Sequence, residues 1–152
     1  MTTFRALSRG TQIVLVAGPL VVVSLFFTWQ LVEVDYGPAG IATMPLDGFD
    51  AWGLLLALLA AGTTTLVVLR SLTAVGMPEE VSWDTVTLAL GVATAAVAAV
   101  KNLTDAGSSW ASYGFLVLAL AVGCGTYLDW AAARRSREPV LTRKRRGFRP
   151  TA

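Results

Sequence analysis

The stretch AWGLLLALLAAGTTTLVVL, residues 51–69, contains no charged side chain and lies between Asp50 and Arg70. An α-helix of about twenty residues is about 30 Å long, which matches the hydrocarbon core of a bilayer. The stretch therefore predicts a membrane-spanning helix.

Similar uncharged runs recur before and after this stretch. The 152 residues are 55% hydrophobic and 14% charged, whereas roughly a quarter of the residues in a soluble domain are charged. We therefore expect an all-α membrane protein, with residues 1–133 forming one domain of four transmembrane helices. The expected spans are about 11–29, 51–69, 85–103 and 111–130.

The third run is short and rich in alanine, glycine and threonine. It reaches spanning length only by including Lys101. Small residues allow close packing between helices, since no hydrophobic force joins helices inside a bilayer. The Lys101 side chain either extends to the headgroups or pairs with a carboxylate of the outer loop, such as Asp47 or Asp50.

The basic residues are distributed unevenly over the two sides of the expected bundle. Of the 12 lysine and arginine residues, all except Lys101 fall on the side of the two termini. Positive charge accumulates on the cytoplasmic side of membrane proteins. We therefore expect both termini in the cytoplasm and the loop 30–50 outside it.

The outer loop 30–50 is acidic and contains no basic residue. Leu31, Glu33 and Asp35 alternate with apolar residues, and YGPAG follows, a pattern typical of a strand and a turn. The run IATM predicts the returning strand of a β-hairpin. Two strands alone are marginally stable in water, so this hairpin should rest on helix ends or on another protein.

Aromatic residues mark the ends of the expected helices. Trp29 ends the first run, and Phe49 and Trp52 precede or begin the second. They form either an anchoring belt at headgroup depth or an outward patch for a partner or a lipid. The candidate partner-binding residues are Trp29, Glu33, Asp35, Asp47, Phe49, Asp50, Trp52 and Lys101.

Catalytic chemistry has little support in the sequence. There is no histidine, and the one cysteine, Cys124, is expected to be a buried, unreactive packing residue. An enzyme would require Asp35, Asp47 and Asp50 to converge on a metal ion. We expect no enzymatic activity and no cofactor.

The segment 134–152 is expected to be a basic cytoplasmic tail, divided by Pro139. Arginine clusters that follow a membrane span attract anionic lipid, which we favour over nucleic acid as the partner of this tail. The candidate lipid contacts are Arg134, Arg135, Arg137, Arg143, Lys144, Arg145, Arg146, Phe148 and Arg149.

These patterns favour a non-enzymatic accessory subunit or scaffold that binds a larger membrane or cell-envelope protein through its helix faces and acidic outer loop. An outer loop too long for a simple connector supports this interpretation. The alternative is a small channel or lipid-handling protein that acts as a homo-oligomer, with Thr63, Thr64, Thr65 and Thr94 lining a polar path.

The segments SLFFTW, GFDAWG and KNL carry one resemblance. Together with the basic residue before the first run, they resemble a broad group of small four-helix membrane proteins of actinobacteria. That resemblance implies the same topology and a bacterial plasma membrane, and it implies no particular activity.

Overall fold

The computed structural model describes residues 4–72, 82–105 and 107–146, with side chains as far as Ser136. A 3-10 turn η1 (Phe4–Ala6) precedes the first helix, and a second, η2 (Gly37–Ala39), lies at the tip of a β-hairpin. The helices are α1 (Arg9–Ser24), α2 (Ala51–Leu72), α3 (Trp83–Thr104) and α4 (Trp110–Arg146), and the strands are β1 (Gln30–Asp35) and β2 (Ile41–Leu46).

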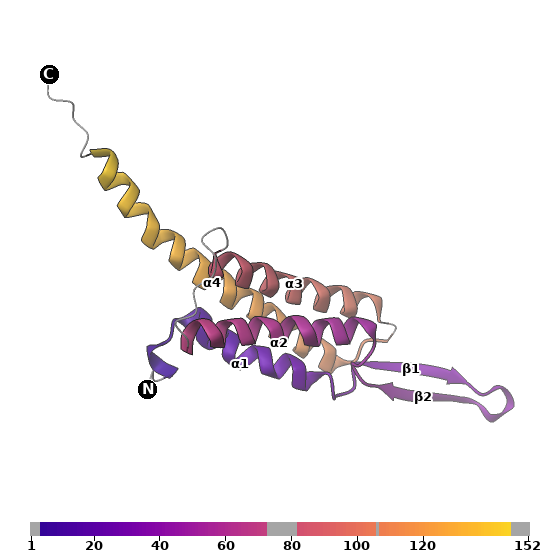
Figure 1. Ribbon diagram of the computed structural model, residues 1–152. Helices are drawn as coiled ribbons and strands as arrows, with labels where there is room; N and C mark the ends of the chain where they lie inside the picture. Colours follow the sequence, from indigo (N-terminus) through magenta and orange to yellow (C-terminus); the bar gives the residue numbers. More distant parts are fainter. Residues whose placement is uncertain (1–3, 73–81, 106, 147–152) are drawn as a thin grey trace, which may run out of the picture.

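The four helices form one bundle in which chain neighbours are also spatial neighbours (Figure 1). α1 also packs against α4, which closes the bundle. The hairpin projects from one end, whereas the start of α1 and the extension of α4 lie at the other (Figure 1). The expected helical fold and the expected hairpin between the first two helices are both confirmed.

Small residues let the helices approach closely, as their frequency in the third run predicted. A Cβ atom added to Gly91 of α3 would overlap the side chain of Thr126 on α4. The threonine hydroxyls are satisfied within their own helices, since Thr63 donates to the Leu59 carbonyl at 2.7 Å and Thr94 to the Leu90 carbonyl at 2.8 Å. Both hydroxyls therefore have a hydrogen-bond partner inside the bundle.

In the described part of the chain, three helices are long and apolar enough to cross a membrane, judged by length and composition. They correspond to the second, third and fourth expected spans, and they cover Ala51–Ser71, Trp83–Thr104 and Trp110–Ser136. Between 28% and 33% of the residues in their most apolar windows are buried inside the bundle. Cys124 is among the exposed residues of α4, so its expected burial is wrong.

The first span differs from its expected bounds of 11–29. α1 ends at Ser24, and the amides of Leu25, Phe26 and Phe27 bond three residues back in a tighter turn. The chain then turns inward, and Trp29 becomes fully buried instead of ending the helix. Hydropathy alone missed this boundary because the residues on both sides of it are equally apolar.

The hairpin pairs β1 with β2 in antiparallel register, from Gln30 opposite Leu46 to Asp35 opposite Ile41. Along β1 the burial alternates as predicted, whereas every residue of β2 is exposed. Pro45 lies opposite Leu31, whose N–H donates at 2.9 Å to the carbonyl of Gly107. A proline at this position leaves one edge of the hairpin without an N–H, which hinders pairing with another strand.

The fourth helix is longer than expected. Its backbone stays helical through Pro139 as far as Arg146, so the helix continues into the expected tail beyond residue 130 (Figure 1). Proline removes one hydrogen bond from a helix without necessarily ending it, and α1 likewise contains Pro19 in its interior.

Candidate partner-binding site at the hairpin end of the bundle

Trp29 is the residue on which the base of the hairpin rests. Its side chain is 0% exposed, and its indole Nε1–H donates to the Ser24 carbonyl at 2.9 Å. That carbonyl belongs to the last turn of α1 and also accepts from the Phe27 N–H at 3.1 Å, so the indole adds a second bond to the helix end. The ring also lies 5.6 Å from that of Phe115 on α4. Trp29 was expected to be a candidate contact residue, but its burial makes it a support for the site.

Backbone hydrogen bonds hold both sides of Trp29 in place. Its N–H donates to the Leu46 carbonyl and its carbonyl accepts from the Ser109 N–H, each at 2.9 Å. The Ser109 hydroxyl donates at 2.7 Å to the carbonyl of Thr28. The hairpin is therefore fixed to the segment that leads into α4.

Lys101 is buried beneath the hairpin, with its side chain 0% exposed. Its Nζ atom lies 2.8 Å from Asp50 Oδ2, 3.1 Å from Asp105 Oδ2 and 5.2 Å from the centre of the Trp29 ring. Of the two interpretations left open for Lys101, the structure shows the ion pair, and with Asp50 instead of Asp47. The contact with Asp105 was missed, although the spacing of four residues along a helix is a readable signal.

Asp50 serves two elements at once. Its Oδ1 atom accepts a hydrogen bond from the Gly53 N–H at 2.6 Å and so caps the first turn of α2, while Oδ2 contacts Lys101. Burial is the largest single influence on its pKa, and it raises the pKa. The hydrogen bonds from Lys101 and Gly53 and the charge of Lys101 act in the opposite direction and together outweigh it, so the pKa of Asp50 lies below its ordinary value.

A second polar network joins the end of α3 to the start of α4. The Asn102 side chain donates at 2.9 Å to the Ser112 hydroxyl, which in turn donates at 2.7 Å to the Ser109 carbonyl. The Ser108 hydroxyl donates at 3.0 Å to the carbonyl of Asn102. Buried polar groups that are fully bonded in this way fix one arrangement of the surrounding backbone.

The remaining candidate residues are on the surface. Glu33 and Asp35 are exposed on one face of β1, and the Asp35 carboxylate accepts from the Gly37 N–H at 2.8 Å. The exposed Asp47 accepts from the Phe49 N–H at 3.1 Å. We call seven of the exposed side chains, on the two faces of the hairpin, the hairpin surface: Leu31, Glu33, Asp35, Tyr36, Ile41, Met44 and Leu46.

A partly exposed aromatic group lies beside the base of the hairpin. Phe49 packs edge-on against Phe26 at 4.7 Å between ring centres, and both rings remain exposed. Trp52, at the start of α2, is also exposed. Of the three aromatic candidates, Phe49 and Trp52 are therefore accessible to a partner or to lipid, whereas Trp29 is not.

The basic candidates lie at the opposite end of the molecule. Arg134 and Arg135 are exposed on α4, and the Arg134 guanidinium stacks 4.3 Å from the centre of the Trp130 ring. Arg137, Arg143, Lys144, Arg145 and Arg146 belong to α4, and their side chains lie outside the described part. Phe148 and Arg149 lie outside the described residues altogether.

Within the described ranges, no three histidine, cysteine, aspartate or glutamate side chains are grouped so that they could hold a metal ion. No family model matches the chain, and neither the curated proteins nor the solved structures contain a match. The resemblance to small actinobacterial membrane proteins therefore stays a prediction. The geometry of the hairpin end is the strongest indication of function in the described part of the chain.

Proposed function

We propose that the protein crosses a bacterial plasma membrane four times, with both termini in the cytoplasm and the hairpin outside. Three helices of sufficient length and hydropathy support this proposal. α1 has 16 residues and is about 24 Å long, and the apolar turn that follows it adds the remaining depth. The positive charges near the termini support the orientation.

Labelling of single cysteines tests the orientation. In a Cys124→Ser background, Asp35→Cys should react with a membrane-impermeant maleimide in intact cells, because Asp35 is exposed on the hairpin. Arg135→Cys should react only after the membrane is permeabilised. The reverse pattern would refute the proposed orientation.

We further propose a non-enzymatic accessory subunit or scaffold that binds a larger membrane or envelope protein. One observation carries this proposal: the hairpin projects beyond the bundle (Figure 1), and its surface is both apolar and acidic. Ile41 is 69% exposed, and Tyr36 and Met44 are about half exposed. Exposed aromatic, methionine and isoleucine side chains on a firmly held base provide a preorganised surface for a protein partner.

The burial of the threonines favours this proposal over an oligomeric channel. Thr63 and Thr94 have no exposed surface and bond to their own helices, so they do not face a neighbouring copy. Thr65 is exposed and Thr64 is half-buried, and both border a groove between α1 and α2. A pore lined by all four threonines would therefore require the bundle to repack.

Affinity purification in mild detergent tests the scaffold proposal. We expect the wild-type chain to retain a stoichiometric protein partner. Replacing Tyr36, Ile41 and Met44 by serine should release that partner, because these side chains form the apolar part of the hairpin surface. A matched control replaces the exposed Leu54, Leu58 and Val117 on the helices by alanine and should retain it. A homogeneous ring of the chain alone would contradict the proposal.

A further inference from the structure

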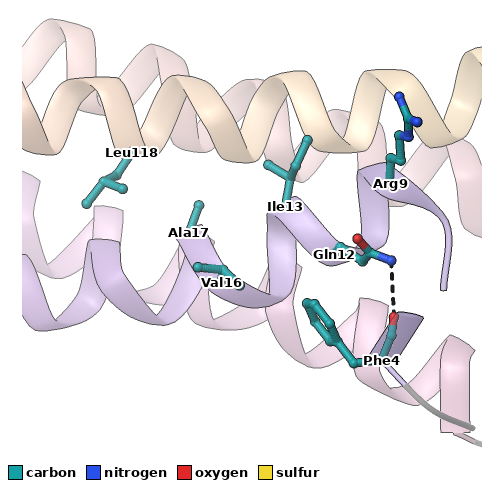
Figure 2. A pocket seen from close by; sticks show the side chains of 7 residues that line it. All are labelled: Phe4, Arg9, Gln12, Ile13, Val16, Ala17 and Leu118. Carbon is teal, nitrogen blue, oxygen red and sulfur yellow. Dashed lines mark hydrogen bonds between the residues drawn. The ribbon is translucent and has the colours of Figure 1, made fainter. Parts of the chain in front are cut away.

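A groove of about 540 Å³ lies between α1 and α4, at the end of the bundle opposite to the hairpin. Ile13, Val16 and Ala17 of α1 and Leu118 of α4 line its apolar part, and Phe4 of η1 borders it (Figure 2). A volume of this size falls within the range of roughly 300–1,000 Å³ that small-molecule sites occupy.

The border formed by Phe4 is held by specific hydrogen bonds. The Gln12 side-chain amide donates to the Phe4 carbonyl at 3.1 Å, as Figure 2 shows, and to the Leu7 carbonyl at 3.0 Å. These bonds fasten η1 against the first turns of α1 and keep the Phe4 ring beside Val16 and Ile13. The groove is therefore a built feature of the fold.

Arg9 supplies a positive charge at the polar end of the groove, with Leu118 at the other end (Figure 2). Arg9 is exposed and takes no part in the ion pairs between described residues. The cations of those pairs are Arg70 and Lys101. The nearby carboxylate of Asp129 is instead engaged by the hydroxyls of Ser8 at 2.5 Å and Thr11 at 2.8 Å. The guanidinium of Arg9 is thus available to an anion.

We infer that this groove binds one anionic phospholipid, with an acyl chain along Ile13, Val16 and Leu118 and the phosphate at Arg9. Arg9 and Ala17 are eight positions apart on one helix, which corresponds to about 12 Å along its axis. That length fits an acyl chain between the headgroup level and the middle of a bilayer about 30 Å thick. The inference rests on the proposed membrane insertion and is independent of the proposed protein partner.

Native mass spectrometry of the full chain in detergent tests this inference, with phosphatidylglycerol and phosphatidylcholine of the same acyl chains as probes. We expect one retained phosphatidylglycerol and a clear preference for it over phosphatidylcholine. Arg9→Gln should weaken its binding about fivefold, the factor that one basic side chain contributes near an anionic surface. Arg5→Gln removes the same charge outside the groove and should have a smaller effect.

A second pair of variants tests the apolar part of the groove. Val16→Trp places a large ring in the groove and should abolish retention of the single lipid. Leu20→Trp adds the same bulk to an exposed position of α1 that does not line the groove. This variant should retain phosphatidylglycerol as the wild type does. Equal retention of both lipids, equal losses in Arg9→Gln and Arg5→Gln, or unchanged binding by Val16→Trp would each overturn the inference. A chain that stays dispersed without detergent would instead refute the membrane insertion.

Discussion

The Nζ atom of Lys101 lies 2.8 Å from Oδ2 of Asp50, although 51 positions separate the two residues in the chain. The pair joins the last turn of α3 to the residue that caps α2, directly beneath the hairpin. Asp105 adds a second carboxylate at 3.1 Å. A buried cation with two acidic partners therefore fastens the end of α3 to the start of α2, beside the Trp29 ring on which the base of the hairpin rests.

Removing the lysine should cost more than removing its partner. Lys101→Met leaves both carboxylates without their cation and should destabilise the protein by about 3 kcal/mol, at the low end for a buried pair because Asp50 is partly exposed. Asp50→Asn leaves Lys101 paired with Asp105 and should cost about 1 kcal/mol. Thermal unfolding in detergent measures both, and the double variant should lose less than the sum. Additive losses would show that the pair is not coupled.

The stability should depend on pH through Asp50. Because its pKa is lower in the folded protein than in the unfolded chain, its contribution is fully present above about pH 4 and disappears as the pH falls through the folded-state pKa. Melting temperatures between pH 7 and pH 3 should therefore fall more steeply for the wild type than for Asp50→Asn. Parallel curves would mean that Asp50 does not contribute in this way.

The indole N–H of Trp29 should stabilise the end of α1. Trp29→Phe keeps an aromatic ring but loses the hydrogen bond to Ser24, and it should cost about 1 kcal/mol, while Trp29→Ala should cost about 3–5 kcal/mol. Trp110 is 88% exposed, so Trp110→Phe serves as the control and should change stability by less than about 0.5 kcal/mol. Similar losses for the two Trp→Phe variants would contradict the role assigned to Trp29.

The close contact between α3 and α4 should make Gly91 sensitive to a single methyl group. Gly91→Ala would overlap the Thr126 side chain and should cost about 1–3 kcal/mol. Gly62 has open space around its added Cβ position, so Gly62→Ala should be neutral or stabilise α2 by up to about 1 kcal/mol. Thermal unfolding of the two variants separates packing from helix propensity, and equal effects would argue against the close packing.

Much of the fold could be predicted from hydropathy, because runs of about twenty uncharged residues leave few alternatives to a long helix. The end of α1 could not. Leu25, Phe26 and Phe27 are as apolar as the helix before them, and what ends it is a tight turn and the bond between Trp29 and Ser24. These contacts involve backbone carbonyls, which leave no pattern in the sequence.

The candidate site was likewise predictable only where its residues follow a local sequence pattern. The alternation in β1 identified which face of the hairpin carries Glu33 and Asp35. The choice between Asp47 and Asp50 as the partner of Lys101 depends on where the ends of α2 and α3 meet, and this is a tertiary relationship. The helical course through Pro139 was missed because a proline weakens a helix without always ending it.

Photocrosslinking from the hairpin tests the central claim most directly. A photoreactive amino acid at Met44 of the hairpin surface, introduced into the full chain in its native cells, should yield one discrete adduct with a different protein. The same amino acid at Leu58, which is 65% exposed in the middle of α2, should yield no such adduct. An adduct with a second copy of the chain alone, or none from the hairpin, would contradict a role in binding a larger membrane or envelope protein.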